Sequence, residues 1–492
     1  MGSQGPTEIR RHKLLLVGTG GNGIGVAAEL KQNGIDDFRI ISRHSDFGGA
    51  WHANGYPGCY TDVPSMAYQM TRKIRGDWPE RFASRAEMGR YLRSIATEND
   101  LYAHTDFDTE MLEAEWLDGE LCWQVSTSNG VYLARFLLTA TGYLDEPNIP
   151  KIPGLDSFPG RVFHSSLWPA DYTGSGDVVA VVGTGSSGAQ IVPALQKIAS
   201  RVVVLQRTAT YILPRGDLEY TDAERHDYKT KPDKHADRRN EARKEYDEFW
   251  EAMVLAKDTS YSQRMGAEWH AKIDEFGLSP ALQKMVTPDV PFGFRRPIMS
   301  DDYYRAIGES NVDFVAGSLH SVDGGRIKAS TGQEFNVDAI AMATGFKFLG
   351  ATIDRIKRRD GVVISKHQQG HLRAYKAVTP AMCPNLFLIG GSAPNSMCWD
   401  GFFPQAVYPP YVMEMIKYMD AKGIRAMEVR EEAEIAWKRK ADSILEKSPF
   451  SKDPNSFMMD ATGHNKAIFP GGLNDMRDEL STFDPTAYDV LA

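Results

Sequence analysis

Two glycine-rich stretches of the sequence repeat one spacing, Gly-x-Gly-x-x-Gly. The first comprises Gly18, Gly20 and Gly23, and the second comprises Gly183, Gly185 and Gly188 with Ser186 and Ser187 between the last two glycines. In this spacing the first glycine makes a tight turn, the second lets the backbone approach a pyrophosphate, and the third lets a helix pack on a strand. The amino terminus of the following helix offers free N–H groups and a positive dipole end to the phosphates. The chain therefore predicts two dinucleotide sites.

The residue about 20 positions after such glycines contacts the adenosine ribose of the dinucleotide. Counting 19 residues from the last glycine of each stretch (42 − 23 and 207 − 188) leads to Ser42 in the first and to Arg207 in the second. An arginine there suits a 2′-phosphate because its charge and forked donors match phosphate oxygens, and Thr208 adds a hydroxyl donor. The second site is therefore predicted to prefer NADPH over NADH. Ser42 offers one neutral hydrogen bond where an acidic residue is usual, with Arg43 as a neighbouring alternative.

The elements that must position these residues follow from the apolar pattern. Residues 13–34 are typical of a buried strand, a glycine turn and a helix, and residues 38–43 of another buried strand. Residues 177–200 and 201–207 repeat the arrangement, and apolar strands ending in Ala-Thr-Gly follow within residues 136–150 and 339–350. We therefore expect an α/β protein with two Rossmann-like dinucleotide-binding domains, in which the second Ala-Thr-Gly marks the return to the first domain.

The predicted domains are a first part of one dinucleotide domain at 1–150, a second dinucleotide domain at 151–335, and the rest of the first domain with a C-terminal segment at 336–492. Between about 215 and 290 the pattern changes to a helical insertion. Within 233–254 the apolar residues fall at the spacing of one helix face. They are Tyr246, Phe249, Trp250, Met253 and Val254. The charges of this segment are interpreted as a solvated helix surface.

Composition narrows the classes of function. The net charge of −9 does not favour binding to nucleic acid or to an anionic membrane. Cys59, Cys122, Cys383 and Cys398 form no CxxC pair, so a dithiol redox couple and a zinc ribbon are both disfavoured. No apolar segment precedes the first strand as in a signal peptide, and no run is long enough to span a membrane. We expect a cytoplasmic protein with reduced thiols and no metal site; the sequence carries no signal for an oligomeric state.

Two dinucleotide sites in this order are typical of a flavoprotein that a nicotinamide coenzyme reduces. FAD is expected in the first site and NADPH in the second. The absence of a CxxC pair disfavours a disulfide reductase. The destination of the electrons then depends on residues outside the glycine turns.

Three further stretches carry a resemblance to a known family. Residues 158–169 read FxGxxxHxxxWP, residues 48–62 read GGxWxxxxYPGxxxD, and residues 295–297 read Arg-Arg-Pro. The fixed positions that matter below are Gly49, Trp51, Asp62, His164 and Trp168. From about residue 13 to about residue 475 the chain resembles the class B flavoprotein monooxygenases, most closely the Baeyer–Villiger monooxygenases.

The resemblance implies a reaction and assigns roles. NADPH reduces FAD, O2 adds to give a C4a-peroxyflavin, and this species inserts one oxygen atom next to the carbonyl of a small ketone, giving an ester or lactone. Arg296 would supply the cation beside the flavin, and Asp62 the carboxylate that holds it. Arg295 stands where the family has a lysine that reaches the 2′-phosphate. His164 and Trp168 would couple the movements of the two domains, and Gly49 and Trp51 belong to the FAD-binding signature.

Departures from the family pattern keep alternatives open. Phe457 stands where the family often has a tryptophan near the nicotinamide, and Trp399, Asp400, Phe402 and Phe403 are bulkier than the usual stretch beside the flavin. One alternative is oxygenation of a nitrogen or sulfur atom. Another is a flavoprotein that no longer oxygenates, acting as an NADPH oxidase or sensor. The complete FxGxxxHxxxWP signature together with Asp62 and Arg296 favours the ketone reaction.

Overall fold

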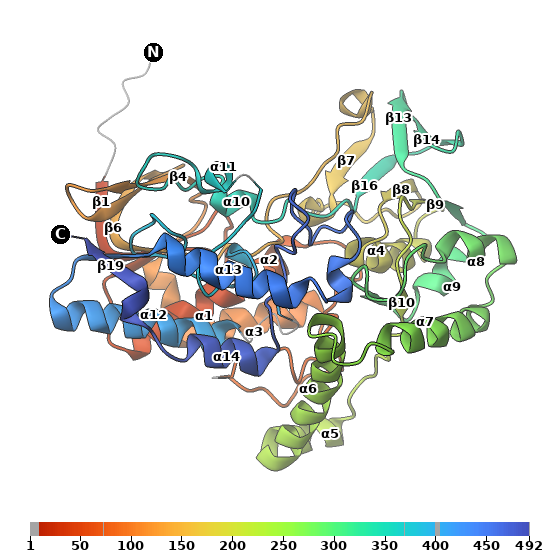
Figure 1. The fold of residues 1–492 in the computed structure, drawn as a ribbon. Helices are drawn as coiled ribbons and strands as arrows, with labels where there is room; N and C mark the ends of the chain where they lie inside the picture. Colours follow the sequence, from red (N-terminus) through yellow and green to blue (C-terminus); the bar gives the residue numbers. More distant parts are fainter. Residues whose placement is uncertain (1–8, 72, 369, 399–403, 492) are drawn as a thin grey trace.

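The computed structural model describes residues 9–71, 73–368, 370–398 and 404–491, and it has two lobes, each built on its own sheet (Figure 1). The first sheet has the strand order β3-β2-β1-β6-β5-β4, and β17 pairs with β6. Its strands are β1 (Ile9–Val17), β2 (Phe38–Ile41), β3 (Thr105–Asp106), β4 (Met111–Leu117), β5 (Cys122–Thr127), β6 (Gly130–Thr139) and β17 (Leu386–Leu388). β1 is parallel to both β2 and β6, whereas β4, β5 and β6 form an antiparallel meander.

The second sheet is fully parallel, with the order β12-β9-β8-β16-β7. Its strands are β7 (Arg161–His164), β8 (Val178–Val182), β9 (Arg201–Leu205), β12 (Val312–Val315) and β16 (Ala339–Met342). Near-continuous apolar runs form these strands because helices cover both faces of such a sheet. In each sheet the strand that leads into Ala-Thr-Gly, β6 or β16, pairs with the strand that leads into the glycine turn. The predicted α/β fold with two Rossmann-like units is confirmed.

Smaller strands extend the two lobes. A three-stranded antiparallel sheet joins β13 (Leu319–Asp323), β14 (Arg326–Ala329) and β15 (Glu334–Asn336). Two short pairs complete the set: β10 (Ile212–Leu213) with β11 (Ile298–Met299), and β18 (Ala426–Val429) with β19 (Tyr488–Leu491).

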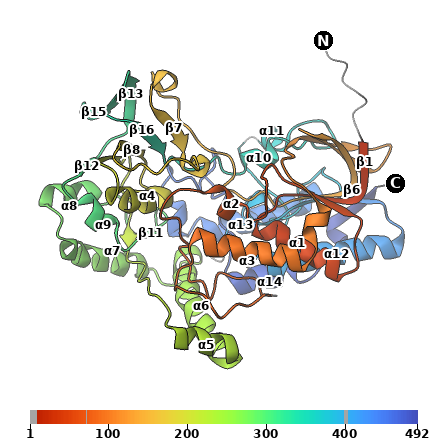
Figure 2. The same cartoon turned by 180° about the vertical axis from the view of Figure 1, so that it is seen from behind.

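Helices pack around the first sheet and follow each glycine turn (Figure 2). They are α1 (Gly21–Gln32), α2 (Ala50–Ala53), α3 (Arg85–Glu98), α4 (Ser186–Gln196), α9 (Tyr303–Ile307), α10 (Gly350–Ile353), α11 (Ile364–His367), α12 (Pro404–Lys422), α13 (Glu431–Leu445) and α14 (Leu473–Leu480). Single 3₁₀ turns are η1 (Leu101–His104), η2 (Leu155–Ser157), η3 (Ser165–Leu167), η4 (Ile273–Phe276), η5 (Gly390–Ser392), η6 (Pro449–Ser451) and η7 (Pro485–Ala487). Among the described residues no helix combines the length and the apolarity needed to span a membrane.

The predicted helical insertion consists of α5 (Asp222–Thr230), α6 (Pro232–Val254), α7 (Tyr261–Lys272) and α8 (Pro280–Val286). In Figure 1 α5 and α6 extend downward from the region between the two lobes. The predicted apolar face of α6 is confirmed, because Trp250, Met253 and Val254 are buried. The Trp250 indole donates a hydrogen bond to the carbonyl of Gly471 (2.8 Å), which ties the insertion to the C-terminal segment.

Two chain crossings connect the lobes, and they pair with each other. The Asn148 N–H donates to the Gly345 carbonyl and the Lys347 N–H donates to the Glu146 carbonyl, both at 2.9 Å. The Thr344 hydroxyl donates to the Asn148 carbonyl at 2.7 Å. The segments that follow β6 and β16 therefore run as a short antiparallel pair, so that movement of one crossing must carry the other.

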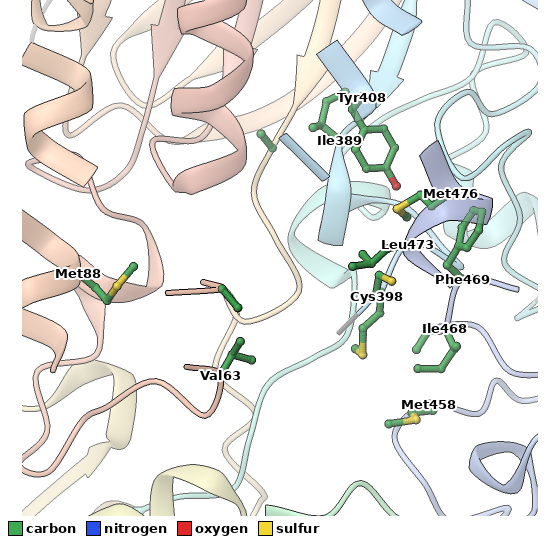
Figure 3. Close-up of a cluster of buried hydrophobic side chains, with 14 of the residues drawn as sticks. Val63, Met88, Ile389, Cys398, Tyr408, Met458, Ile468, Phe469, Leu473 and Met476 are labelled. Atoms are coloured by element: carbon green, nitrogen blue, oxygen red, sulfur yellow. The ribbon is translucent and has the colours of Figure 1, made fainter. Parts of the chain in front are cut away.

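The C-terminal segment shares the core of the first lobe. Figure 3 shows the side chains of Cys398, Tyr408, Met458, Ile468 and Phe469 gathered around one region, and all are buried. The backbone of Met397 bridges to that of Ile468, which joins the stretch after η5 to the C-terminal segment. Burying a side chain of this size stabilises the fold by about 1.5–3 kcal/mol. The segment from 453 to 472 is therefore an integral wall of this lobe.

Candidate active site

The first glycine turn has no room for a side chain at its first and last glycines. Gly18 has a φ of +119°, and a Cβ atom there would lie 2.5 Å from the Ala140 carbonyl oxygen. A Cβ on Gly23 would lie 2.1 Å from the Gly18 carbonyl oxygen, and one on Gly49 would lie 2.6 Å from the Gly20 Cα. The Gly-Gly pair of the second signature therefore rests directly on the fingerprint turn. Trp51 follows on α2, with its ring 5.8 Å from that of Tyr68.

The amino terminus of α1 has the features of an anion site. Its N-cap residue is Gly20, and no side chain caps the helix. Asn22 lies in the first turn with a buried Oδ1 atom that has no hydrogen-bond partner among the described residues. Gly390 approaches closely, since a Cβ there would lie 2.2 Å from the Asn22 Nδ2 atom. The bare N–H groups at the start of α1 and the close glycine backbone around them fit the pyrophosphate of FAD.

Ser42 directly follows β2, and its hydroxyl group is already engaged. It lies 2.8 Å from the Thr19 Oγ1 atom and accepts a hydrogen bond from the His44 N–H at 3.1 Å. The Thr19 hydroxyl donates to the Asp46 carbonyl, so Ser42 donates to Thr19 and keeps one acceptor lone pair for a ribose hydroxyl. Arg43, the predicted alternative, forms an ion pair with Asp145 at 2.8 Å.

His44 introduces a pH dependence beside this site. Burial, with a smaller contribution from the charge of Arg43, lowers the pKa of His44 from 6.5 to about 4. The unfolded chain binds this proton more readily, so stability is complete above pH 6.5 and is lost as the pH falls, by about 1.4 kcal/mol per unit. Between pH 7 and pH 5 the wild type should lose about 2 kcal/mol more than the His44→Gln variant. Denaturant unfolding at both pH values measures this, and equal losses would exclude His44 as the cause.

The second glycine turn repeats the construction with a more open entrance. Gly183 has a φ of +102°, a Cβ there would lie 2.4 Å from the Ala343 carbonyl oxygen, and a Cβ on Gly188 would lie 2.2 Å from the Gly183 oxygen. A Cβ on Gly185, by contrast, would meet nothing within 4 Å. Ser186 and Ser187 begin α4, whose amino terminus no side chain caps. This turn therefore also fits a pyrophosphate, and its entrance is accessible.

Arg207 and Thr208 lie just beyond β9, and both are exposed. Within the part of the chain that the structure describes, the Arg207 side chain has no hydrogen-bond or ion-pair partner. Arg295 lies nearby, because its Nη1 atom donates to the Ala209 carbonyl at 2.9 Å. The Arg295 guanidinium is also paired with Asp289 (2.5 Å) and with the buried Asp453 (2.7 Å). Arg207 is thus the unpaired cation at this strand end, and Arg295 is the paired one.

Arg296 and Asp62 meet although 234 residues separate them. The Arg296 Nη2 atom lies 2.6 Å from the Asp62 Oδ2 atom, and the two side chains are 39% and 35% exposed. The Asp62 charge raises the pKa of Arg296, Tyr143 raises it further, and burial opposes both. The Tyr246 hydroxyl on α6 donates to the Asp62 carbonyl at 2.8 Å. The guanidinium is therefore a permanent, accessible cation that three separate segments position.

The loop between Trp51 and Asp62 docks onto the second lobe. The Tyr56 hydroxyl donates to the Gln190 Oε1 atom at 3.0 Å, and the Gln190 amide donates to the Tyr60 carbonyl at 3.0 Å. Gly58 has a φ of +77°, and a Cβ there would lie 2.6 Å from the Gln190 carbonyl oxygen. The Tyr-Pro-Gly of the signature thus brings this loop against α4, which sets where Asp62 meets Arg296.

His164 is fully buried at the end of β7. Its Nδ1 atom accepts from the Ser166 N–H (3.2 Å), which leaves the proton on Nε2, and Nε2 donates to the Gly345 carbonyl at 2.9 Å. Burial lowers the pKa of His164, so the ring is neutral. Its ring also contacts Phe346 edge-on, with centroids 5.2 Å apart. His164 therefore binds the paired chain crossings between the lobes.

Trp168 follows His164 by four residues, directly after η3. Its indole N–H donates to the Tyr172 carbonyl at 2.9 Å, and its ring packs edge-on against Phe163. A Cβ on Gly55 would lie 3.6 Å from the Trp168 carbonyl oxygen, so the residue touches the loop that leads to Asp62. Trp168 is within contact of both lobes, and neither it nor His164 touches Arg296.

The remaining expectations have mixed outcomes. Trp399, Asp400, Phe402 and Phe403 lie outside the described residues. Phe457 is 49% exposed, with its ring centroid 6.4 Å from that of Phe348. Sequence reasoning missed Tyr143 and Tyr246, which flank the ion pair. The position of Tyr143 directly after the first Ala-Thr-Gly was a signal that could have found it; Tyr246 was predicted only as part of an apolar face.

One cluster of possible metal ligands lies away from this site. His371 Nε2 lies 3.1 Å from Asp442 Oδ2, and the rings of His371 and His464 stack with centroids 4.5 Å apart and planes at 24°. The buried Lys438 ammonium lies 2.7 Å from the other Asp442 oxygen, so the carboxylate is already neutralised. Because the His371 and His464 rings are nearly parallel, their nitrogen lone pairs point along parallel lines instead of converging on one metal ion. The cluster is better explained as a structural anchor, in which His371 is hydrogen-bonded to Asp442 of α13 and stacked on His464 of the C-terminal segment.

Comparisons with known proteins agree with this geometry. Residues 15–221 match a family described as pyridine nucleotide-disulphide oxidoreductase. A Baeyer–Villiger monooxygenase of Streptomyces coelicolor is 31% identical over 98% of this chain and 94% of its own, and one of Pseudomonas aeruginosa is 30% identical over 98% and 92%. The solved structure titled OTEMO complex with FAD and NADP superposes with a TM-score of 0.85 at 25% identity, over 97% of this chain and 99% of its own.

Proposed function

The chain belongs to the Baeyer–Villiger monooxygenases, and we propose that the Arg296–Asp62 ion pair is its catalytic centre. The protein is an FAD-dependent, NADPH-consuming monooxygenase that inserts one oxygen atom of O2 next to a ketone carbonyl. The observation that carries the proposed centre is the 2.6 Å contact between Asp62, on a loop of the first lobe, and Arg296, on the segment that leads into β11. Its substrate is a small organic molecule.

Both cofactors fit the residues present. We propose that Gly18, Gly20, Gly23, Ser42 and Gly49 hold FAD, with Trp51 beside them. NADPH would bind at the second glycine turn, together with Ser186, Ser187, Arg207 and Thr208. Arg295, held by its two carboxylate partners, would lie near the 2′-phosphate. When bound, the flavin accepts a hydride from NADPH and supplies the electrons that activate O2.

Arg296 would stabilise the negative charge that develops on the substrate. The ketone oxygen becomes negative when its carbonyl carbon is attacked, and a fixed cation lowers the energy of that state because it needs no reorganisation. Asp62 holds the guanidinium in one direction and keeps it protonated at any working pH. The Tyr246 hydroxyl bonds to the Asp62 carbonyl, so α6 helps to hold the loop that carries Asp62 in position. This arrangement favours the ketone reaction over oxygenation of nitrogen or sulfur, which needs no such oxyanion stabilisation.

The experiment that tests this function measures NADPH consumption together with product. Purified protein with FAD is given NADPH, O2 and a ketone or a thioether of matched size. An ester or lactone in amounts close to the NADPH consumed supports the proposal. Sulfoxide formation without ester from any ketone would assign the heteroatom reaction, and NADPH consumption that yields only hydrogen peroxide would indicate an oxidase.

The domain division follows the two lobes. We propose that residues 1–150 and the chain from about 344 onward form the FAD domain, and that the segment between them forms the NADP domain with its insertion. The expected boundary at 335/336 comes too early, because β16 (Ala339–Met342) pairs with β7 and β8 in the second sheet. The crossings near 146–148 and 344–347 are then the hinge. We also place the enzyme in the cytoplasm, since all four cysteines are buried free thiols.

His164 provides a test of coupling across this hinge. Replacing it by alanine removes the bond to the Gly345 carbonyl, so we expect the product formed per NADPH to fall severalfold while FAD affinity stays unchanged. His164→Gln, which keeps a donor, should recover part of the yield. The matched control is His320→Ala, on an exposed strand position. If His164→Ala lowers only the melting temperature and leaves the yield intact, His164 serves packing alone.

A further inference from the structure

An aromatic wall extends from the catalytic ion pair toward the C-terminal segment. We use this name for Tyr143, Phe348 and Phe457. The ring centroids of Tyr143 and Phe348 are 5.9 Å apart, and those of Phe348 and Phe457 are 6.4 Å apart. Tyr143 contributes to the raised pKa of Arg296, so one end of the wall lies at the guanidinium. Phe457, at the other end, is 49% exposed.

Backbone and core contacts hold Tyr143 and Phe348 of the aromatic wall in position. Gly391 permits the approach of Tyr143, because a Cβ there would lie 2.5 Å from the Tyr143 Cδ1 atom. Phe348 directly follows the crossing that pairs with the first linker and packs against both the core of the first sheet and the larger core. The wall is therefore a preformed apolar surface beside a catalytic cation, which is typical of a pocket for an organic substrate.

Lys466 places a second cation on this wall. Its Nζ atom lies 5.6 Å from the centroid of the Phe348 ring. Its backbone is held on both sides: the N–H donates to the Met458 carbonyl (2.8 Å), and the carbonyl accepts from the Asn395 N–H (2.7 Å). The side chain is partly buried, and burial lowers the pKa of Lys466.

No described carboxylate forms an ion pair with Lys466. Asp460 attracts the Lys466 ammonium without an ion-pair contact. One Asp460 oxygen accepts from the N–H and hydroxyl of Thr462 and from the His464 N–H, and the other is buried without a hydrogen-bond partner among the described residues. A partly desolvated ammonium without an ion-pair partner is costly, and an incoming anion would recover that cost. The lysine of this wall is therefore set for an anionic ligand rather than for a structural salt bridge.

We propose that Lys466 binds the carboxylate of the substrate, so that the enzyme oxygenates ketones carrying an acidic group. This proposal rests on the proposed function of Arg296. The apolar or aromatic body of the ketone lies along the aromatic wall, its carbonyl faces Arg296, and its carboxylate reaches Lys466. A phosphate of the coenzyme has the same charge and could bind a lysine as well, so the test separates the two sources.

The test compares an acid with its neutral ester. The probes are δ-benzoylvalerate and its methyl ester, with the shorter β-benzoylpropionate pair as a second length. Binding to the oxidised FAD enzyme is measured by calorimetry, which needs no turnover, and kcat/KM is measured separately. For at least one pair the wild type should bind the acid about tenfold more tightly than the ester, as expected for one charge-assisted contact. Lys466→Met should abolish the difference, and Lys466→Arg should retain most of it.

The controls make every outcome decisive. Lys447→Met removes the same charge at an exposed position and should leave the acid preference unchanged. If the wild type binds neither acid more tightly than its ester, or if Lys466→Met keeps the preference, the proposal is wrong. If Lys466→Met instead weakens NADPH binding, the lysine serves the coenzyme and the proposal is also wrong. A retained acid preference in binding with no ester product from any ketone would refute the proposed function and leave the anion site intact.

Discussion

Replacing Arg296 by alanine should lower the rate of ketone oxygenation by at least a hundredfold while NADPH still reduces the flavin at a rate close to that of the wild type. Removing one preformed group that stabilises an oxyanion typically costs a factor of 10² to 10³ in kcat. The hydride transfer needs the glycine turns and the hinge, not the guanidinium. Anaerobic stopped-flow absorbance gives the reduction rate, and product analysis gives the oxygenation rate.

Three variants accompany this measurement. Arg296→Lys keeps the charge but loses the planar fork that meets Asp62, so it should recover only part of the activity. Asp62→Asn should also lower oxygenation, because the guanidinium loses the carboxylate at 2.6 Å. Arg305→Ala changes an exposed arginine on α9 and should have no effect. Oxygenation by Arg296→Ala near the wild-type rate would contradict its catalytic role.

The Arg207→Ala variant should raise KM for NADPH by about 10- to 100-fold and leave KM for NADH almost unchanged. A charge-assisted contact with a phosphate is worth about 1.5–3 kcal/mol, and only NADPH carries the 2′-phosphate. Arg207 suits this role because it is exposed and unpaired within the described part of the chain, whereas Arg295 is shared between two carboxylates. Steady-state kinetics with both coenzymes measures the two values.

A matched variant controls for charge. Arg201→Ala removes an arginine from the opposite end of β9, where it is paired with Asp313, and should change neither constant. The double variant with Arg295→Ala reports the contribution of the paired arginine. Equal effects of Arg207→Ala on NADPH and NADH would remove Arg207 from the 2′-phosphate site.

Local patterns predicted most of the fold. Both glycine turns could be predicted because the need for positive φ at Gly18 and Gly183 and for close contact at Gly23 and Gly188 restricts those positions to glycine. The buried face of α6 could be predicted because helical periodicity depends only on neighbouring residues. The Arg296–Asp62 pair came from signature motifs rather than from any local pattern.

Contacts between distant segments could not be read from the chain. The engagement of Arg295 by Asp453 depends on how the C-terminal segment packs against the insertion, and the Tyr246 contact with Asp62 depends on where α6 docks. The occupied hydroxyl of Ser42 results from Thr19 on the neighbouring turn. Likewise, Lys466 carried no signal in the sequence, because its significance comes from its place above Phe348. Tertiary packing, not propensity, decides such contacts.

The most direct test of the central claim is to follow the oxygen atom. The enzyme, supplied with FAD and NADPH, oxidises a ketone under O2 labelled with the heavy isotope, and mass spectrometry locates the label. One heavy atom in each ester or lactone, at the ring or bridging position, with the loss of this product in Arg296→Ala, is the expected result. Unlabelled product, or labelled product at the wild-type rate from Arg296→Ala, would contradict oxygen insertion at the Arg296–Asp62 centre.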